Sequence, residues 1–369
     1  MANSQPSYFM QLLRMVGKII VGGLTIVFMI SFAGALLNPQ AIDGDIEQDR
    51  FVTLLGDPDS GNVLLRINVS GLILGVPPFV DPGPFNFFSG NLAVTYGYAV
   101  KEALKKASEN EDVKGVLIHM ATPGGTVFGS KAVAEGIASY RETTGKPVVV
   151  YIEGLSASGG VMSMVTADAV YADEGSYIGS IGVLGAAVVF YDQPTAFDGG
   201  FLQGGVTTQG GIEQTIIYAG RSKDLGNPFR RLTDEERVVL QTGVNDLYQD
   251  FVQHVAEARD IEPDLIVDTM GAQIFSNAQA ERYGLIDGTR SYDGAISELA
   301  ALAELGDDWR LARERAPSTS NWARLFMSAF DMTDEPRDVS ESLRGDVCTA
   351  ARLQALLYMG NPAELCAIP

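Results

Sequence analysis

The fold is decided by the stretch VVVYIEGLSASGG at residues 148–160, which is followed by VMSM at 161–164. The first five residues are β-branched or aromatic and predict a buried strand. The small residues that follow predict a tight turn, and the apolar residues after the turn predict a helix. A strand that runs through a turn into a helix is the first half of a βαβ unit.

The same alternation continues on both sides of this stretch. We expect strands at 63–69, 115–120 and 147–152, and helices at 96–108, 130–141, 158–167, 233–259 and near 277–283. Thr233 with Glu236 three residues later fits a capping box at the start of the longest helix. Strands that alternate with helices predict an α/β fold with a mostly parallel sheet.

Three short segments carry the candidate chemistry. Ser158 lies among small residues, which would let a substrate backbone approach its hydroxyl and leave N–H groups free for an oxyanion. A second glycine turn, TPGG, occupies residues 122–125, and Lys223 lies in the loop AGRSKDLGNP at 219–228. Together they favour acyl transfer by a Ser-Lys dyad. A lysine is a base only when neutral, so Lys223 would need a largely apolar surrounding.

Other interpretations of these residues stay open. Ser158 alone would be a tight turn without chemistry more often than not, and Lys223 alone would be a surface lysine. The chain has two histidines, His119 and His254, and neither lies in a recognisable nucleophile motif. A Ser-His-Asp triad can still draw on residues that are distant in sequence.

Five motifs in this order resemble those of the SppA-type signal peptide peptidases. They are residues 112–118 with the turn 122–125, the nucleophile turn 156–160, GSIGV at 179–183, the lysine loop 219–224 and AERYGLID at 280–287. The resemblance extends over about residues 60 to 290. Each motif is weak by itself, but five in the same order are specific.

The resemblance implies a Clp/crotonase-like α/β spiral of βαβ units and a serine endopeptidase. Ser158 would be the nucleophile and Lys223 the general base, while the N–H groups of Gly125 and Gly159 would form the oxyanion hole. Ser180 would hydrogen-bond the lysine and orient it. No metal, nucleotide or other cofactor would be needed.

The resemblance also implies partners. The substrates would be signal-peptide remnants or other membrane-near polypeptides, and the chain would form a homo-oligomer in which serine and lysine meet across a subunit boundary. Two departures from the family pattern occur. Ala121-Thr122 stands where Asn-Ser is usual, and the interval between Ser158 and Lys223 is long, with the extra length near 198–211.

An uncharged apolar stretch runs from Ile19 to Leu37 and is long enough to cross a membrane as a helix. Arg14 and Lys18 precede it, and the first acidic residue is Asp43. The positive-inside rule then predicts a single-pass protein of the inner membrane with its catalytic domain on the extracytoplasmic side. A cleaved signal peptide is the main alternative, since AGA at 33–35 fits a cleavage site, and a buried soluble helix is a weaker one.

Composition limits the remaining functions. A net charge of −20 and a pI near 4.4 argue against a nucleic-acid partner. Cys348 and Cys366 could pair in an oxidising compartment, but the sequence does not decide this. We expect a cytoplasmic N-terminus at 1–18, the anchor at 19–37, a linker at 38–60, a peptidase domain at 61–300, and a linker and tail at 301–369 with a last helix at 346–359.

Two other functions remain open at this point. A phage-type head maturation protease has a similar lysine loop, although the apolar stretch at 19–37 counts against it. A catalytically silent SppA-like membrane scaffold is the second, because the altered turn at 121–122 and the long interval could have removed activity. Intact Ser158 and Lys223 count against the scaffold.

Overall fold

The computed structural model describes residues 50–76, 94–192 and 215–315, together with Lys18, Pro194, 196–197, 206–207, 209–213 and 356–358. The chain divides into two compact units, residues 1–50 and 51–369. The first unit is described only at Lys18 and Arg50. The fold below belongs to the second unit.

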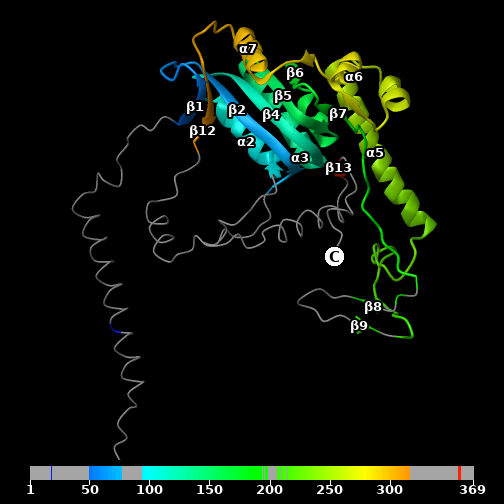
Figure 1. The fold of residues 1–369 in the computed structure, drawn as a ribbon. Helices are drawn as coiled ribbons and strands as arrows, with labels where there is room; N and C mark the ends of the chain where they lie inside the picture. Colours follow the sequence, from blue (N-terminus) through cyan, green and yellow to red (C-terminus); the bar gives the residue numbers. More distant parts are fainter. Residues whose placement is uncertain are drawn as a thin grey trace, which may run out of the picture. The chain divides into compact units, whose positions relative to one another are not determined.

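A mixed eleven-stranded sheet forms the centre of this unit (Figure 1). Its main path is β1 (Phe51–Gly56), β12 (Arg310–Glu314), β2 (Val63–Leu74), β4 (Val113–Thr126), β5 (Val148–Ala157), β6 (Ala169–Ala172) and β11 (Gly288–Thr289). From β12 to β11 every neighbouring pair is parallel. The expected α/β class with a mostly parallel sheet is therefore confirmed.

Four shorter strands pair with the last residues of the central strands or with one another. These are β3 (Val94–Tyr96) on β2, β7 (Tyr177–Gly179) on β5, β10 (Ile274–Ser276) on β7, and β13 (Leu356–Tyr358) on β4. A separate two-stranded sheet joins β8 (Ala196–Phe197) to β9 (Val206–Thr207). The β7 and β13 additions matter most here, because both lie where β4 and β5 end.

Helices cover both faces of the sheet (Figure 1). Helices α2 (Gly97–Ser108), α3 (Val127–Thr144) and α4 (Gly159–Met164) pack on one face, and α7 (Tyr292–Leu302) packs on the other. Alternation along β4 produces this division, since Ile118 belongs to the core with Ile137 of α3 and Leu117 belongs to the core with Leu299 of α7.

Local signals explain where the long helices begin and end. The Thr126 hydroxyl accepts a hydrogen bond from the Gly129 N–H at 3.3 Å and caps α3, which ends at Gly145 in the left-handed conformation. Thr233 and Glu236 form the predicted capping box at the start of α5 (Asp234–Arg259). The chain then continues through a π-helix, η3 (Leu265–Met270), to α6 (Asn277–Arg282).

Two strands lie where the sequence predicted linkers. Residues 51–56 form β1 within the predicted linker 38–60, and residues 310–314 form β12 within the predicted tail 301–369. The two strands pair with each other, and β12 also pairs with β2. Their pairing joins positions more than 240 residues apart, for example Phe51 with Glu314, so no local sequence pattern could predict it.

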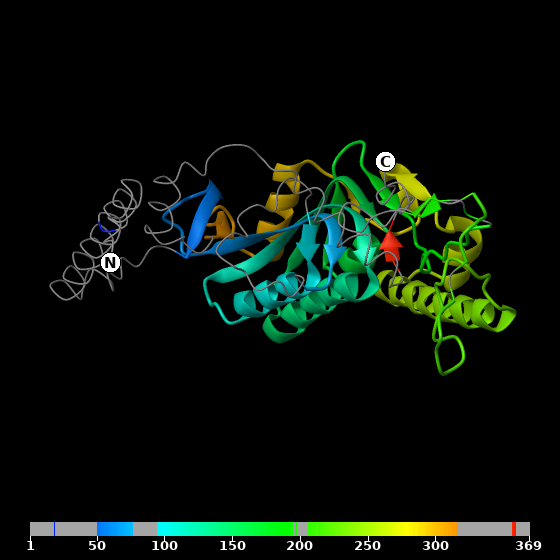
Figure 2. The same ribbon diagram turned by 90° about the horizontal axis from the view of Figure 1, so that it is seen from below.

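The described part of the tail also differs from expectation. The predicted helix at 346–359 is contradicted at Leu356–Tyr358, which form the antiparallel strand β13 on β4 (Figure 2). The predicted anchor at 19–37 and both cysteines lie outside the described residues, as does most of 198–211. Within the part of the chain that the structure describes, no helix combines the length and apolarity needed to cross a membrane.

Candidate active site

Ser158 stands at the junction of β5 and α4, where the sequence placed the turn. Its backbone has φ 53° and ψ −110°, and its side chain is fully buried. A residue with a Cβ rarely adopts positive φ, and such strain is concentrated at functional sites. The fold therefore holds this serine in a conformation that ordinary turn formation does not require.

The segment after β7 contacts Ser158 on two sides. The Ser158 N–H donates to the Gly179 carbonyl at 2.8 Å, and the Ser158 hydroxyl lies 3.4 Å from the Gly182 carbonyl. The second contact is long for a hydroxyl donor and leaves Oγ weakly held. Ser180 lies between these two carbonyls, is 9% exposed and also has positive φ, at 58°. The structure thus brings Ser158 and the Ser180 segment together.

The second glycine turn forms the end of β4 rather than a free loop. Gly125 lies opposite Ile73 of β2 on one edge, and a Cβ added to it would meet the Ile73 carbonyl oxygen at 1.9 Å. Only glycine fits this approach of two backbones. Thr122 donates to the Gly71 carbonyl at 2.6 Å and accepts from the Gly124 N–H at 3.0 Å. The threonine of the divergent Ala121-Thr122 pair therefore ties the turn to β2.

The other edge of β4 carries β13. This edge pairs with β5 as far as Thr122 and Ser156, and it then pairs with β13 through Gly124, Gly125 and Thr126. The new neighbour thus begins where β5 turns away toward Ser158. Strand β13 also lies close to α4, which starts at Gly159. An extended, antiparallel segment consequently occupies the sheet edge at Gly125, close to the helix that follows Ser158.

Lys223 is not brought to Ser158 within one chain. Its side chain is exposed, and its backbone N–H donates to the Gly220 carbonyl at 3.2 Å. Among the described residues, the Lys223 ammonium has no hydrogen-bond or ion-pair partner, so the predicted contact with Ser180 is also not formed. The loop lies instead before the N-terminus of α5.

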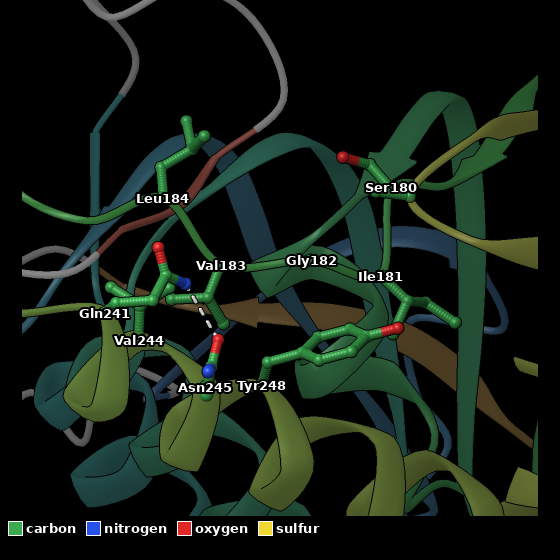
Figure 3. Close-up of a pocket in the computed structure, with 10 residues that line it drawn as sticks. Ser180, Ile181, Gly182, Val183, Leu184, Gln241, Val244, Asn245 and Tyr248 are labelled. Carbon is green, nitrogen blue, oxygen red and sulfur yellow. Dashed lines mark hydrogen bonds between the residues drawn. The ribbon is translucent and has the colours of Figure 1, made fainter. Parts of the chain in front are cut away.

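A pocket of about 340 Å³ adjoins the Ser158 segment (Figure 3). Its walls are mostly apolar, and Gly182 and Ser180 contribute its edge nearest Ser158. Helix α5 supplies three polar side chains, Gln241, Asn245 and Tyr248, of which Gln241 donates to Asn245 at 2.8 Å. Burial, followed by the nearby Asp268 charge, raises the pKa of Tyr248. The sequence analysis missed these residues, although their spacing of four and three places them on one helix face.

A second pocket of about 460 Å³ continues along the same helix. The two pockets share Val183, Leu184, Gln241 and Val244, so they form one groove between the 180–188 segment and α5. A concave, mostly apolar surface with a few polar groups is the usual form of a ligand-binding site.

The two histidines have partners other than Ser158. His119 Nδ1 accepts from Arg66 at 2.6 Å, and His119 Nε2 lies 2.7 Å from Glu153. His254 Nε2 donates to the Met162 carbonyl at 2.9 Å. The geometry gives no support to a histidine base for Ser158. In the described ranges, no group of three His, Cys, Asp or Glu side chains is arranged to hold a metal ion.

Sequence comparison assigns the family. Residues 141–306 match the family described as Peptidase family S49. The chain is 30% identical over 342 residues to the capsid assembly protease C of Escherichia phage lambda, covering 88% of this chain and 72% of that protein. The chain therefore belongs to peptidase family S49.

Two further relatives share the same region. A protein of Methanocaldococcus jannaschii named as a protease is 35% identical over 204 residues, which cover 55% of this chain. A protein of Enterococcus faecium named after signal peptide peptidase SppA is 26% identical over 248 residues, which cover 67% of this chain. The chain spans 61% and 66% of the lengths of these two proteins.

Proposed function

We propose that this chain is a membrane-anchored serine endopeptidase with a Ser-Lys dyad, acting on signal-peptide remnants or other membrane-near polypeptides. The observation that carries the proposal is Ser158, a buried serine with positive φ at a strand-to-helix junction in a chain of family S49. The name of the Enterococcus relative supports the substrate class. A Clp/crotonase-like spiral is the fold we propose for the peptidase domain.

The pairing of β13 supports a peptide substrate. It demonstrates that the edge of β4 at Gly124–Thr126 accepts an extended, antiparallel segment. A polypeptide that binds by adding a strand gains main-chain hydrogen bonds, and neighbouring pockets then select its side chains. In the complex that we propose, the pocket lined by Ser180 and Gly182 receives one such side chain.

The exposure of Lys223 supports a dyad formed between two copies of the chain. Ile217, Val238 and Val239 lie near this loop in sequence and are 97%, 62% and 66% exposed. Exposed apolar side chains of this kind mark surfaces that a partner covers. In the homo-oligomer that we propose, this surface is buried and Lys223 of one copy enters the Ser158 site of its neighbour, where burial favours the neutral amine.

The reaction then proceeds by acyl transfer. Neutral Lys223 accepts the proton of the Ser158 hydroxyl as Oγ attacks the peptide carbonyl, and Gly125 and Gly159 N–H groups stabilise the oxyanion. The lysine returns the proton to the leaving amine. Lys223 next takes a proton from water as the water oxygen attacks the acyl-enzyme carbonyl, and it then gives that proton to Ser158 Oγ as the acyl C–O bond breaks, which releases the second product and restores the serine hydroxyl and the neutral lysine. Ser180 orients the amine.

Labelling with a fluorophosphonate probe tests the proposal. Wild-type protein should be labelled and should cleave peptides, whereas Ser158→Ala should do neither. Ser156→Ala is the matched control, since Ser156 is equally buried, lies two residues away, and directs its hydroxyl at the sulfur atoms of Met120 and Met164. Equal labelling of wild type and Ser158→Ala would show that Ser158 is not the nucleophile and would favour a catalytically silent membrane scaffold.

The membrane part of the proposal rests on residues 19–37. We expect the full chain to resist carbonate extraction and a chain lacking 19–37 to be released. Protease added to spheroplasts should digest the domain after Asp43. A domain that stays protected until lysis would contradict the proposed orientation.

The phage relative favours a second candidate function. Capsid assembly protease C matches the largest share of this chain among the three relatives above. A maturation protease would act on assembling structural proteins and would not depend on residues 19–37. Activity of the chain lacking 19–37 on soluble protein substrates, with none on membrane-bound peptides, would favour this candidate.

A further inference from the structure

An arginine clamp holds Asp224, the residue that follows Lys223 in the sequence. Arg230 donates to both carboxylate oxygens of Asp224, from Nη2 at 2.6 Å and from Nε at 2.8 Å. It also donates to both carboxylate oxygens of Glu236, at 2.8 Å each. One guanidinium thus holds two carboxylates in paired geometry, which is the strongest arrangement available to these groups.

This cluster is shielded from water, unlike other ion pairs nearby. The side chains of Asp224 and Glu236 are 4% and 3% exposed, and that of Arg230 is 28% exposed. Hydrogen bonds from Arg230 lower the pKa of Asp224 and, with the Thr233 backbone contribution, lower that of Glu236 to about 2. Both carboxylates therefore stay charged, so the cluster holds across the physiological pH range.

The cluster fixes the residue that follows Lys223. Asp224 accepts hydrogen bonds from Arg230 through both of its carboxylate oxygens. Ser222 is held at φ 62°, a left-handed conformation that a serine rarely adopts. Glu236 is itself fixed to α5 by the capping box with Thr233. The side chain of Lys223, which lies between Ser222 and Asp224, is exposed.

We propose that Arg230 is a positioning residue that holds the Lys223 loop on the N-terminus of α5, so that the lysine is presented in one geometry. The inference rests on the proposed role of Lys223 as base. Arg230 touches no reacting atom and acts only through the loop. A displacement of a catalytic group by about 1 Å can lower a rate by roughly 10²-fold.

Steady-state kinetics of the full-length protein test this role. Arg230→Gln should lower kcat by about 10- to 100-fold and change KM by less than about threefold, because binding is kept and the base is misplaced. Arg230→Lys, which cannot form both paired contacts, should fall between Arg230→Gln and wild type. Arg221→Gln is the matched control, since Arg221 lies in the same loop and pairs with the exposed Glu235. It should behave as wild type.

The outcomes separate the inference from the proposed function. If Lys223→Ala is inactive but Arg230→Gln matches Arg221→Gln, the positioning role is wrong and the dyad stands. If Lys223→Ala stays active, the dyad itself is wrong. Thermal unfolding shows whether each variant is folded. If Arg230→Gln does not fold, the kcat of Arg230→Lys tests the positioning role instead. A folded Arg230→Lys variant with wild-type kcat would overturn the inference.

Discussion

The backbone N–H of Ser158 donates a 2.8 Å hydrogen bond to the carbonyl of Gly179. This bond joins the end of β5 to the end of β7 at the point where Ser158 takes positive φ. The neighbouring strand thereby holds the serine in a backbone conformation that its own side chain disfavours. The strain has a measurable consequence, because glycine would not share it.

We predict that Ser158→Gly is more stable than Ser158→Ala by about 1 kcal/mol, although both lack the nucleophile. Alanine keeps the Cβ and the strain, whereas glycine removes both at some cost in unfolded-chain entropy. Urea unfolding would measure the difference. Ser163, inside α4, is the control: there alanine should be more stable than glycine, as in other helices. The same order at both positions would contradict strain at Ser158.

Replacing the proposed base by arginine should abolish activity. Lys223→Arg keeps the positive charge but cannot become neutral near physiological pH, so kcat/KM should fall by at least about 10²-fold, nearly as far as in Lys223→Ala. Lys106→Arg, an exposed change on α2, should have no effect. An active Lys223→Arg variant would place the proton acceptor elsewhere.

Mixed oligomers should recover activity from two inactive proteins. If Ser158 and Lys223 come from different copies, co-assembled Ser158→Ala and Lys223→Ala chains contain some sites with both groups intact, about one quarter of them for random mixing around a closed ring. Peptide hydrolysis after co-expression measures this. Mixtures no more active than their components would show that one copy supplies both groups.

His119 should make stability depend on pH. Burial, followed by the Arg66 charge, lowers its pKa below 6.5, and Glu153 acts in the opposite sense. Below about pH 6.5 the unfolded chain then binds a proton that the folded chain does not, so stability falls as pH falls. The stability advantage of wild type over His119→Gln should therefore shrink between pH 7.5 and 5.5 in urea titrations. A growing advantage would mean that the Glu153 pairing dominates.

Local elements of the fold could be predicted from the sequence, because their signals lie within a few residues. The strand and turn before Ser158, helix α2 and the capping box at Thr233 are of this kind. Strands β1 and β12 could not be predicted, since they are short and partly exposed and acquire their form only by pairing with distant residues.

The site was predictable in its residue types and only partly in its geometry. Small residues and a serine after a strand indicated Ser158, and the family resemblance implied that Lys223 would meet it only across a subunit boundary, but the residues alone could not place Lys223 on an exposed loop. The Arg230 cluster left a weak signal, because Asp224, Arg230 and Glu236 follow one another at intervals of six residues around a predicted helix start. Opposite charges at that spacing are common on protein surfaces, so the cluster differs from an ordinary surface ion pair only in the burial of its two carboxylates, which the sequence does not reveal.

Strand β13 competes with a substrate for the same edge of β4, because it already pairs with that edge. Under the proposed function, an incoming polypeptide must take the place beside Gly124–Thr126 that Leu356–Tyr358 hold. A tethered segment acts at an effective concentration on the order of millimolar, and dilution does not lower it. Polypeptides that are present at low concentration, or that have little tendency to form an extended strand, would then fail to displace the tail. The selectivity for substrates would then depend partly on the free energy needed to displace Leu356–Tyr358 from the β4 edge, and not only on how well a substrate side chain fits a pocket.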